Sequence, residues 1–252
     1  RNIEQDLITC INKCNIEIDG FILEPLASSY SVLDNNERNL GTVLIDIGGG
    51  TSDIIIYNDN SILHTGAIPI GGESLTKDIA YGIQTSLEQA ETLKRDYGIC
   101  KSSLANEEES IKIMGTNGRP DTNVSQKELS KIIEARMHEI FHLCKNEINK
   151  SELKSKFTFG IVLTGGGSKM KNIVDLAQEI FEMPVKIGIP DSVNGKPEVL
   201  NNPRFSTSIG IVKYAIENEN SIQGDIDNYH TKSFFDIIKI KLNKIKQTLL
   251  NK

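Results

Sequence analysis

Hydrophobic and polar positions along the chain follow two periods, which together predict a mixed α/β protein. Segments with apolar residues every three or four positions are expected to be helices, and short runs rich in Ile and Val bounded by turn residues are expected to be strands. The expected helices cover residues 3–14, 25–33, 73–84, 86–97, 125–149, 169–181 and 206–216. The expected strands cover residues 18–23, 42–47, 53–57, 61–70, 158–163 and 185–187, with short strands and loops in 101–123.

The last part of the chain has a different pattern. Residues 219–231 are polar and typical of a linker, and residues 232–252 predict an amphipathic helix with lysines outside its apolar side. We expect this helix to lie in a membrane interface, and the alternative is a helix packed on the protein's own core. The apolar side consists of Phe234, Phe235, Ile238, Leu242, Ile245 and Leu249.

Composition narrows the possible classes of protein. The formal net charge is −6 although residues 232–252 are basic, so the rest of the chain is acidic and general nucleic-acid binding is not expected. The chain has no apolar run long enough to span a membrane and does not begin like a signal peptide, which favours a cytosolic location. The absence of CxxC spacing favours buried thiols over metal ligands for the four cysteines. These are Cys10, Cys14, Cys100 and Cys144.

The segment LIDIGGGTSDIIIY is the most informative motif. It places three glycines between two predicted strands, whereas a dinucleotide-binding motif or a P-loop would lead from a strand into a helix. Successive glycines allow backbone amides to approach a polyphosphate, and Asp46 at the strand end could hold Mg²⁺ through water. The alternative is a hairpin with surplus glycine. The candidate phosphate-binding residues are Asp46, Gly48, Gly49, Gly50 and Thr51.

A second motif points to a different chemistry. His138, Glu139 and His142 spell HEIFH, which matches the HExxH signature of zinc proteases. In the predicted helix both histidines fall opposite the apolar stripe, so we expect them to face water rather than a catalytic cleft. That stripe consists of Ile133, Met137, Ile140, Phe141, Cys144 and Ile148.

The glycine turn and four other segments, one of which is IGGESLTKDIA from Ile70, resemble the superfamily of actin, the heat-shock chaperones and the sugar kinases. Asp46 to Asp53 match its second phosphate loop, and ILEPLASSYS places Glu24 where relatives carry a residue near the attacking water. AETLK places Glu91 and Lys94 on one helix face, where the resemblance implies contact with a ribose. LTGGGS looks like the adenosine loop, formed here by Gly165, Gly166, Gly167 and Ser168. The resemblance therefore implies ATP and Mg²⁺ as cofactors, with Glu24 and Asp46 as catalytic residues.

Within this superfamily the chain is most similar to the FtsA family. NLGTVLIDIGGGTSDIIIY, IPIGGESLTKDIA, AETLKRDYG and IVLTGGGS occur in the family's order. The resemblance implies an actin-like (ribonuclease H-like) ATPase fold that is incomplete at the N-terminus, because the first phosphate loop is missing. It assigns 1–40 to the first lobe and 41–218 to the second, with a smaller subdomain at 86–157. It expects the final helix, 205–218, to pack back on the first lobe.

The family resemblance also implies a function. It predicts an ATP-binding division protein with at most slow hydrolysis, which polymerises and tethers the FtsZ ring to the cytoplasmic face of the cell membrane at the septum. The implied partners are the C-terminal tail of FtsZ, other copies of the chain, anionic lipids and other divisome proteins. Arg136 matches the family's arginine in the FtsZ-binding region, and an ordinary solvated charge is the alternative. A chaperone-like or sugar-kinase-like ATPase and a pilus-assembly protein are the competing functions.

Overall fold

The computed structural model describes residues 3–115, 118, 120–151, 157–191 and 200–218. The chain divides into a larger unit, Leu23–Lys213, and a smaller one that combines Arg1–Ile22 with Tyr214–Lys252. The predicted linker and the predicted amphipathic helix, including its six apolar residues, lie outside the described residues. The predicted site residues from Glu24 to Ser168 all belong to the larger unit, which is therefore the part described in detail.

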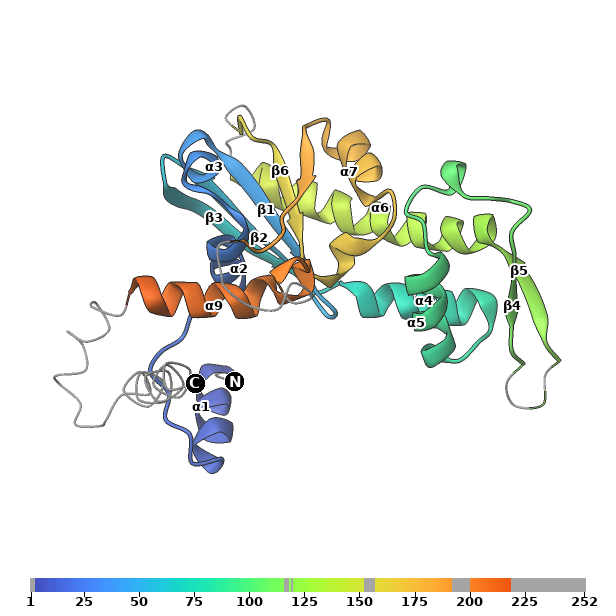
Figure 1. The fold of residues 1–252 in the computed structure, drawn as a ribbon, viewed down its shortest axis with the longest axis horizontal. Helices are drawn as coiled ribbons and strands as arrows, with labels where there is room; N and C mark the ends of the chain where they lie inside the picture. The colour runs from blue at the N-terminus through green and yellow to red at the C-terminus, as the bar shows by residue number, and fades with distance from the viewer. Residues whose placement is uncertain (1–2, 116–117, 119, 152–156, 192–199, 219–252) are drawn as a thin grey trace, which may run out of the picture. The chain divides into compact units, whose positions relative to one another are not determined.

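A five-stranded mixed sheet forms the centre of the larger unit, in the order β3-β2-β1-β6-β7 (Figure 1). The strands are β1 (Thr42–Ile47), β2 (Ser52–Asn58), β3 (Ser61–Ile68), β6 (Ile161–Thr164) and β7 (Val185–Ile187). β1 pairs antiparallel with β2 and parallel with β6, and this register sets Asp46 opposite Asp53 on one side and Thr164 on the other. The first glycine turn and the residues after β6 therefore meet at one edge of the sheet.

The central strand β1 is buried on both faces, which explains why it is apolar along almost its whole length. Val43 and Ile45 point into the main core, where they join apolar residues of α6 (Gln126–Lys150) and α7 (Ile173–Phe181). Leu44 points to the opposite face, which packs against the end of α2 (Glu24–Val32). A strand covered on both faces shows a continuous hydrophobic run rather than alternation.

The N-terminal half of α6 carries a second group of elements (Figure 1). They are α4 (Gly72–Ile83), α5 (Leu87–Tyr97), the 3₁₀ turn η1 (Ser102–Leu104), β4 (Ser110–Ile113) and β5 (Thr122–Ser125). Ser125 precedes α6 and forms a capping box with Glu128. The Ser125 hydroxyl accepts a hydrogen bond from the Glu128 amide, and the Glu128 carboxylate accepts one from the Ser125 amide. The sequence pattern predicted this start.

The remaining elements are α1 (Ile3–Lys13), α3 (Asn35–Leu40), η2 (Gly166–Lys169), η3 (Pro203–Phe205) and α9 (Ser206–Glu217). α9 contacts α2 closely, because a Cβ atom built on Gly210 would lie 1.7 Å from the carbonyl oxygen of Ala27. Within the larger unit, α2, the sheet and the start of α9 therefore form one packed assembly.

Four sequence predictions are wrong in detail. Residues 18–23 form no strand, because no described strand pairs with them. The strand expected from residue 158 begins at Ile161, after a turn in which Gly160 has φ +69°. The helix expected from residue 169 begins at Ile173, because Asn172 has φ +59°. The short helix α3, which Asp34 caps, was not predicted.

The cysteine prediction is half wrong. Cys100 and Cys144 are buried, and burial raises the pKa of each thiol to about 12, so they are inert core thiols. Cys10 and Cys14 are exposed, because the described residues of the smaller unit leave this side of α1 uncovered.

The side chains of α6 follow the predicted pattern. All six residues of the predicted stripe are buried. His142 is exposed and His138 half-buried, and their rings stack with centroids 5.8 Å apart. Within the described ranges, no group of three potential metal-binding side chains comes together around these histidines or anywhere else. The same ranges contain no helix with the length and apolar character needed to cross a membrane.

Candidate functional site

A cleft of about 610 Å³ opens between the glycine turn after β1, the helices α4 and α5, and the segment after β6. Six of its lining residues were predicted from the sequence. They are Gly48, Gly49, Glu91, Lys94, Gly166 and Gly167. The structure thus brings together three segments that lie far apart in the chain.

The first side of the cleft is the glycine turn, which the start of α4 holds in place. The amides of Gly72 and Glu73 donate to the carbonyls of Gly48 and Gly49, at 2.9 and 2.8 Å. A Cβ atom at Gly71 would lie 2.6 Å from the Gly49 oxygen, so this contact requires glycine. No described group accepts the amides of Gly49 and Gly50. The turn therefore offers backbone donors of the kind that bind phosphates.

Asp46 lies beside this turn and is 4% exposed. Its Oδ2 accepts a hydrogen bond from the Ser28 hydroxyl at 2.5 Å. Burial raises the pKa of Asp46, the neighbouring carboxylate of Asp53 raises it further, and the hydroxyls of Ser28 and Thr207 act in the opposite direction. The structure therefore holds a desolvated carboxylate next to a second negative charge.

Glu24 belongs to the same acidic group. Burial is the largest cause of the raised pKa of this carboxyl, and the charges of Asp53 and Asp46 add to it. The Thr51 hydroxyl donates to Asp53 at 2.9 Å and partly offsets the burial that raises the pKa of Asp53. α2 thus brings Glu24 close enough to the two strand carboxylates for their charges to act on it.

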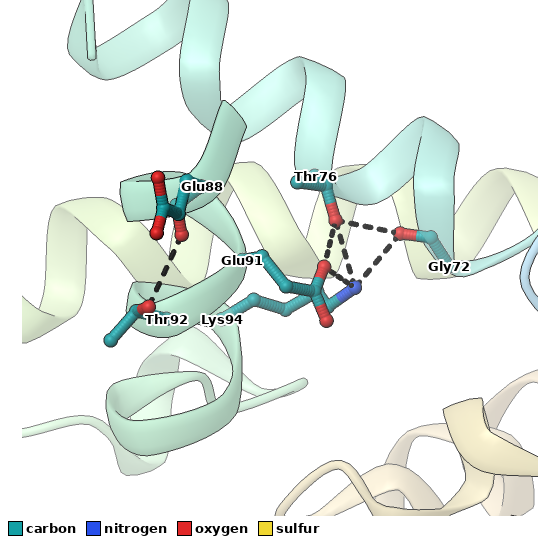
Figure 2. A network of polar contacts seen from close by, with 6 residues as sticks. All are labelled: Gly72, Thr76, Glu88, Glu91, Thr92 and Lys94. Atoms are coloured by element: carbon teal, nitrogen blue, oxygen red, sulfur yellow. Dashed lines mark hydrogen bonds and ion pairs between the residues drawn. The ribbon is translucent and has the colours of Figure 1, made fainter. Parts of the chain in front are cut away.

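Glu91 and Lys94 form a second side of the cleft, where α5 faces the start of α4 (Figure 2). Lys94 Nζ donates to Glu91 Oε2, Thr76 Oγ1 and the Gly72 carbonyl at 2.6, 2.8 and 3.0 Å. Burial raises the pKa of Glu91, but the hydrogen bonds from Lys94 and Thr76 outweigh it and lower the pKa overall. The network fixes both side chains on one helix face at the cleft, and Thr76 is a member that the sequence did not predict.

The glycines after β6 have different roles. A Cβ atom at Gly165, whose φ is +82°, would lie 2.2 Å from Asp46 Oδ1, so this residue supports Asp46 and does not line the cleft. A Cβ atom at Gly167 would meet Ile47 at 2.4 Å. Gly166 has space, since its nearest neighbour would be Arg204 Cγ at 3.6 Å. Ser168 is buried, and its hydroxyl donates to the Gly165 carbonyl.

Several cleft residues were missed by the sequence analysis. Arg95, Lys169, Lys171 and Arg204 add cationic side chains to the lining. Arg95 and Lys169 lie next to predicted residues and could have been found as neighbours of AETLK and LTGGGS. Arg204 follows Asn-Pro at a distant position in the chain, and no local pattern distinguishes it from a surface arginine.

Arg136 lies away from this lining. Its guanidinium makes a bidentate ion pair with Asp78 of α4, with N···O distances of 2.5 and 2.9 Å, and also contacts Glu139. The side chain is 24% exposed, so Arg136 is a half-buried link between α4 and α6 rather than a freely solvated charge.

The fold and the cleft define the class of protein, an actin-like ATPase fold. MreB 5 of Spiroplasma citri bound to AMPPNP matches with a TM-score of 0.68 and 21% identity, over 90% of this chain and 67% of that chain. A PilM-PilN type IV pilus biogenesis complex matches with a TM-score of 0.62 and 16% identity, over 83% of this chain and 56% of that one. At these identities the likeness concerns the fold alone.

The sequence comparisons identify the family. The family model of cell division protein FtsA matches residues 43–210. Cell division protein FtsA of Pseudomonas aeruginosa is 42% identical over 218 residues, which are 86% of this chain and 52% of the relative. That of Escherichia coli K12 is 32% identical over 245 residues, 94% of this chain and 58% of the relative. The chain belongs to the FtsA family of cell division proteins, and it spans about half the length of these relatives.

Proposed function

We propose that the protein is an actin-like division protein that binds ATP with Mg²⁺ in the cleft, hydrolyses it slowly at most, and assembles into polymers. The observation that carries this proposal is the meeting of the two glycine segments with the Glu91–Lys94 pair around one cavity of about 610 Å³. Neighbours with the same fold support it, since MreB5 of Spiroplasma citri was solved bound to ADP and, separately, bound to AMPPNP.

The acidic group fits a magnesium ion. Mg²⁺ prefers oxygen ligands, retains several waters and is held by one or two carboxylates. Asp46 and Glu24 each have a pKa raised in part by neighbouring carboxylates, and a divalent cation would remove that repulsion. When bound, the ion would neutralise charge on the phosphates. Asp46 would hold it through water, and Glu24 would accept a proton from the attacking water.

Different residues of the cleft and of the glycine turn would bind the phosphates, the ribose and the nucleoside. The amides of Gly49, which lines the cleft, and of Gly50, which is next to it in the turn, donate to no described acceptor and are suited to phosphate oxygens, and Thr51 follows in the same turn. Glu91 and Lys94 are fixed on one face of α5, where a carboxylate and an ammonium group can both bond ribose hydroxyls. Gly166 leaves the space that the nucleoside needs, because a larger residue there would project toward Arg204.

A substitution at Gly166 tests this assignment. Gly166→Val adds a branched side chain where the structure has room, so the fold is retained and ATP binding is lost. Gly166→Ala is the matched control, which adds only the Cβ atom and should weaken binding less. Fluorescence titration with ATP measures both, and Gly166→Val with the affinity of the unchanged protein would refute the nucleoside position.

Membrane lipids and other division proteins complete the proposed role as partners. The predicted helix at residues 232–252 would attach the polymer to anionic lipids, and the protein would then act at the cytoplasmic face of the membrane at the septum. The FtsZ tail and other divisome proteins would be the protein partners, with Arg136 as the residue that meets an acidic peptide.

The ion pair between Arg136 and Asp78 suggests two variants that test the proposed FtsZ contact. An acidic peptide must compete with Asp78 for the guanidinium, so Arg136→Glu should weaken binding of the FtsZ tail peptide and leave ATP binding intact. Asp78→Asn provides the comparison, because it removes the competing charge of Asp78 while keeping the helix surface, so it should strengthen binding. A peptide titration in which Arg136→Glu binds as tightly as the unchanged protein would contradict this proposal.

A further inference from the structure

A chain of hydroxyl groups connects Asp46 to α2 and α9. Ser28 of α2 is fully buried, and its Oγ donates to Asp46 Oδ2 at 2.5 Å. Thr207, in the first turn of α9, lies 2.9 Å from Ser28 Oγ and 3.4 Å from the same carboxylate oxygen. The short contacts place Ser28 between the other two groups.

The number of protons available on the two hydroxyls sets the direction of these hydrogen bonds. An ionised carboxylate can only accept, so the single proton of Ser28 is used on Asp46. The single proton of Thr207 can point to Ser28 Oγ at 2.9 Å or to Asp46 Oδ2 at 3.4 Å, and the shorter contact gives the order Thr207 to Ser28 to Asp46. Hydrogen bonds in such a chain polarise one another, so the outer hydroxyl strengthens the inner one.

The other carboxylate oxygen is confined as well. A Cβ atom at Gly165 would lie 2.2 Å from Asp46 Oδ1, so the backbone of this segment lies directly against that oxygen. One oxygen is therefore bonded to hydroxyls and the other lies against backbone, which fixes the rotation of the carboxylate plane.

We propose that Ser28 and Thr207 are positioning residues that orient the Asp46 carboxylate toward a divalent cation. The inference rests on the proposed nucleotide function and deepens it, since it assigns the groups behind the metal-binding residue. Neither hydroxyl acts on the nucleotide itself. They act through Asp46, in the way that outer hydrogen-bonding partners of metal ligands fix ligand orientation.

Ser31 provides a matched control for Ser28. Ser31 lies on the same helix as Ser28, is 1% exposed, and donates to the carbonyls of Ser28 and Ser206. Ser31→Ala therefore removes an equally buried hydroxyl that also contacts α9 but does not touch Asp46. Thr207→Val and Thr207→Ser form a second pair, in which the first loses the hydroxyl and keeps the shape while the second keeps the hydroxyl.

The test measures Mn²⁺ affinity by electron paramagnetic resonance in the presence of ATP. Ser28→Ala should weaken Mn²⁺ binding about tenfold or more, as is typical for outer partners of metal ligands. Thr207→Val should weaken it less, and Ser31→Ala and Thr207→Ser should bind as the unchanged protein does. In an Asp46→Ala background, Ser28→Ala should cause no further loss. Equal losses from Ser28→Ala and Ser31→Ala, or no loss from Ser28→Ala, would overturn the inference.

Two outcomes separate this inference from the proposed function. An unchanged protein that binds no Mn²⁺ with ATP would refute the proposed function and the inference with it. A double-mutant cycle on the free energy of unfolding, measured without metal or nucleotide, tests the contact independently. Ser28→Ala and Asp46→Ala should be non-additive while Ser31→Ala and Asp46→Ala add, and additivity of both pairs would count against the inference alone.

Discussion

At the scale of single residues, the ionised carboxylate of Asp46 lowers the free energy of unfolding, because its pKa is raised in the folded protein. A carboxyl whose pKa is higher in the folded than in the unfolded chain binds more protons when folded, so its ionisation opposes folding. That opposing contribution is complete above the folded pKa, decreases as the pH falls below it, and is absent once the pH is below the ordinary value of 3.8. A buried acid that is retained at such a cost is typical of a functional site.

Asp46→Asn tests this balance. The amide oxygen can still accept from Ser28, while the charge beside Asp53 disappears. The variant should therefore unfold at a higher urea concentration than the unchanged protein at neutral pH, in the absence of metal. Its advantage should shrink as the buffer is made acidic, because the carboxyl of the unchanged protein then becomes protonated. An advantage that grows on acidification, or none at neutral pH, would contradict this reading.

The sequence predicted part of the site residue by residue. Gly48, Gly49 and Gly166 could be found because successive glycines are rare outside sites of close backbone approach. Thr76 and Arg204 could not, since the contacts of Thr76 with Lys94 and the position of Arg204 near Gly166 arise from tertiary packing. Local sequence patterns therefore identify the glycines at which the backbone approaches closely. They do not identify side chains that reach the cleft from distant elements.

At the scale of elements, α9 and α2 are packed through a glycine. Gly210→Ala places a Cβ atom 1.7 Å from the Ala27 carbonyl oxygen, so the helices must move apart. We expect this substitution to lower the free energy of unfolding by about 1–3 kcal/mol, the range for overpacked contacts.

The neighbouring residue is the control for that prediction. Ile211 is 46% exposed, and Ile211→Ala should change stability by no more than about 0.5 kcal/mol. Chemical denaturation measures both variants. Similar stability changes for the two would show that the helix surface, rather than the Gly210 contact, determines stability here.

The sequence identified most elements but not all of their ends. The apolar pattern is strong in β1, a continuous run buried on both faces, and in α6, whose apolar residues recur every three or four positions. The errors at Gly160 and Asn172 occur where backbone angles with positive φ interrupt an apolar run, and Asn carries only a weak signal for that conformation. The unpaired segment 18–23 has strand composition but no described neighbour to pair with.

At the scale of the whole molecule, family membership associates the protein with cell division. The chain spans 52% and 58% of the lengths of the relatives from Pseudomonas aeruginosa and Escherichia coli K12. The sequence of residues 232–252 predicts membrane attachment, in which each lysine near an anionic surface adds on the order of 1 kcal/mol.

Two paired variants test the membrane prediction. Phe235→Glu with Ile238→Glu adds two charges to the predicted apolar side, and should move the protein from the pellet to the supernatant when it is sedimented with anionic liposomes. Asn243→Glu with Gln247→Glu adds the same charge on the opposite side and should reduce binding less. Equal loss in both pairs would indicate that charge alone governs attachment, which contradicts an inserted apolar face.

The central claim is that the cleft binds ATP together with Mg²⁺, and calorimetric titration with and without Mg²⁺ tests it most directly. The unchanged protein should bind ATP more tightly with Mg²⁺ than with a chelator. Asp46→Ala should lose that difference, because it removes the carboxylate beside the glycine turn, and should retain its fold by circular dichroism. An Asp46→Ala variant with the same Mg²⁺-dependent affinity as the unchanged protein would contradict the account.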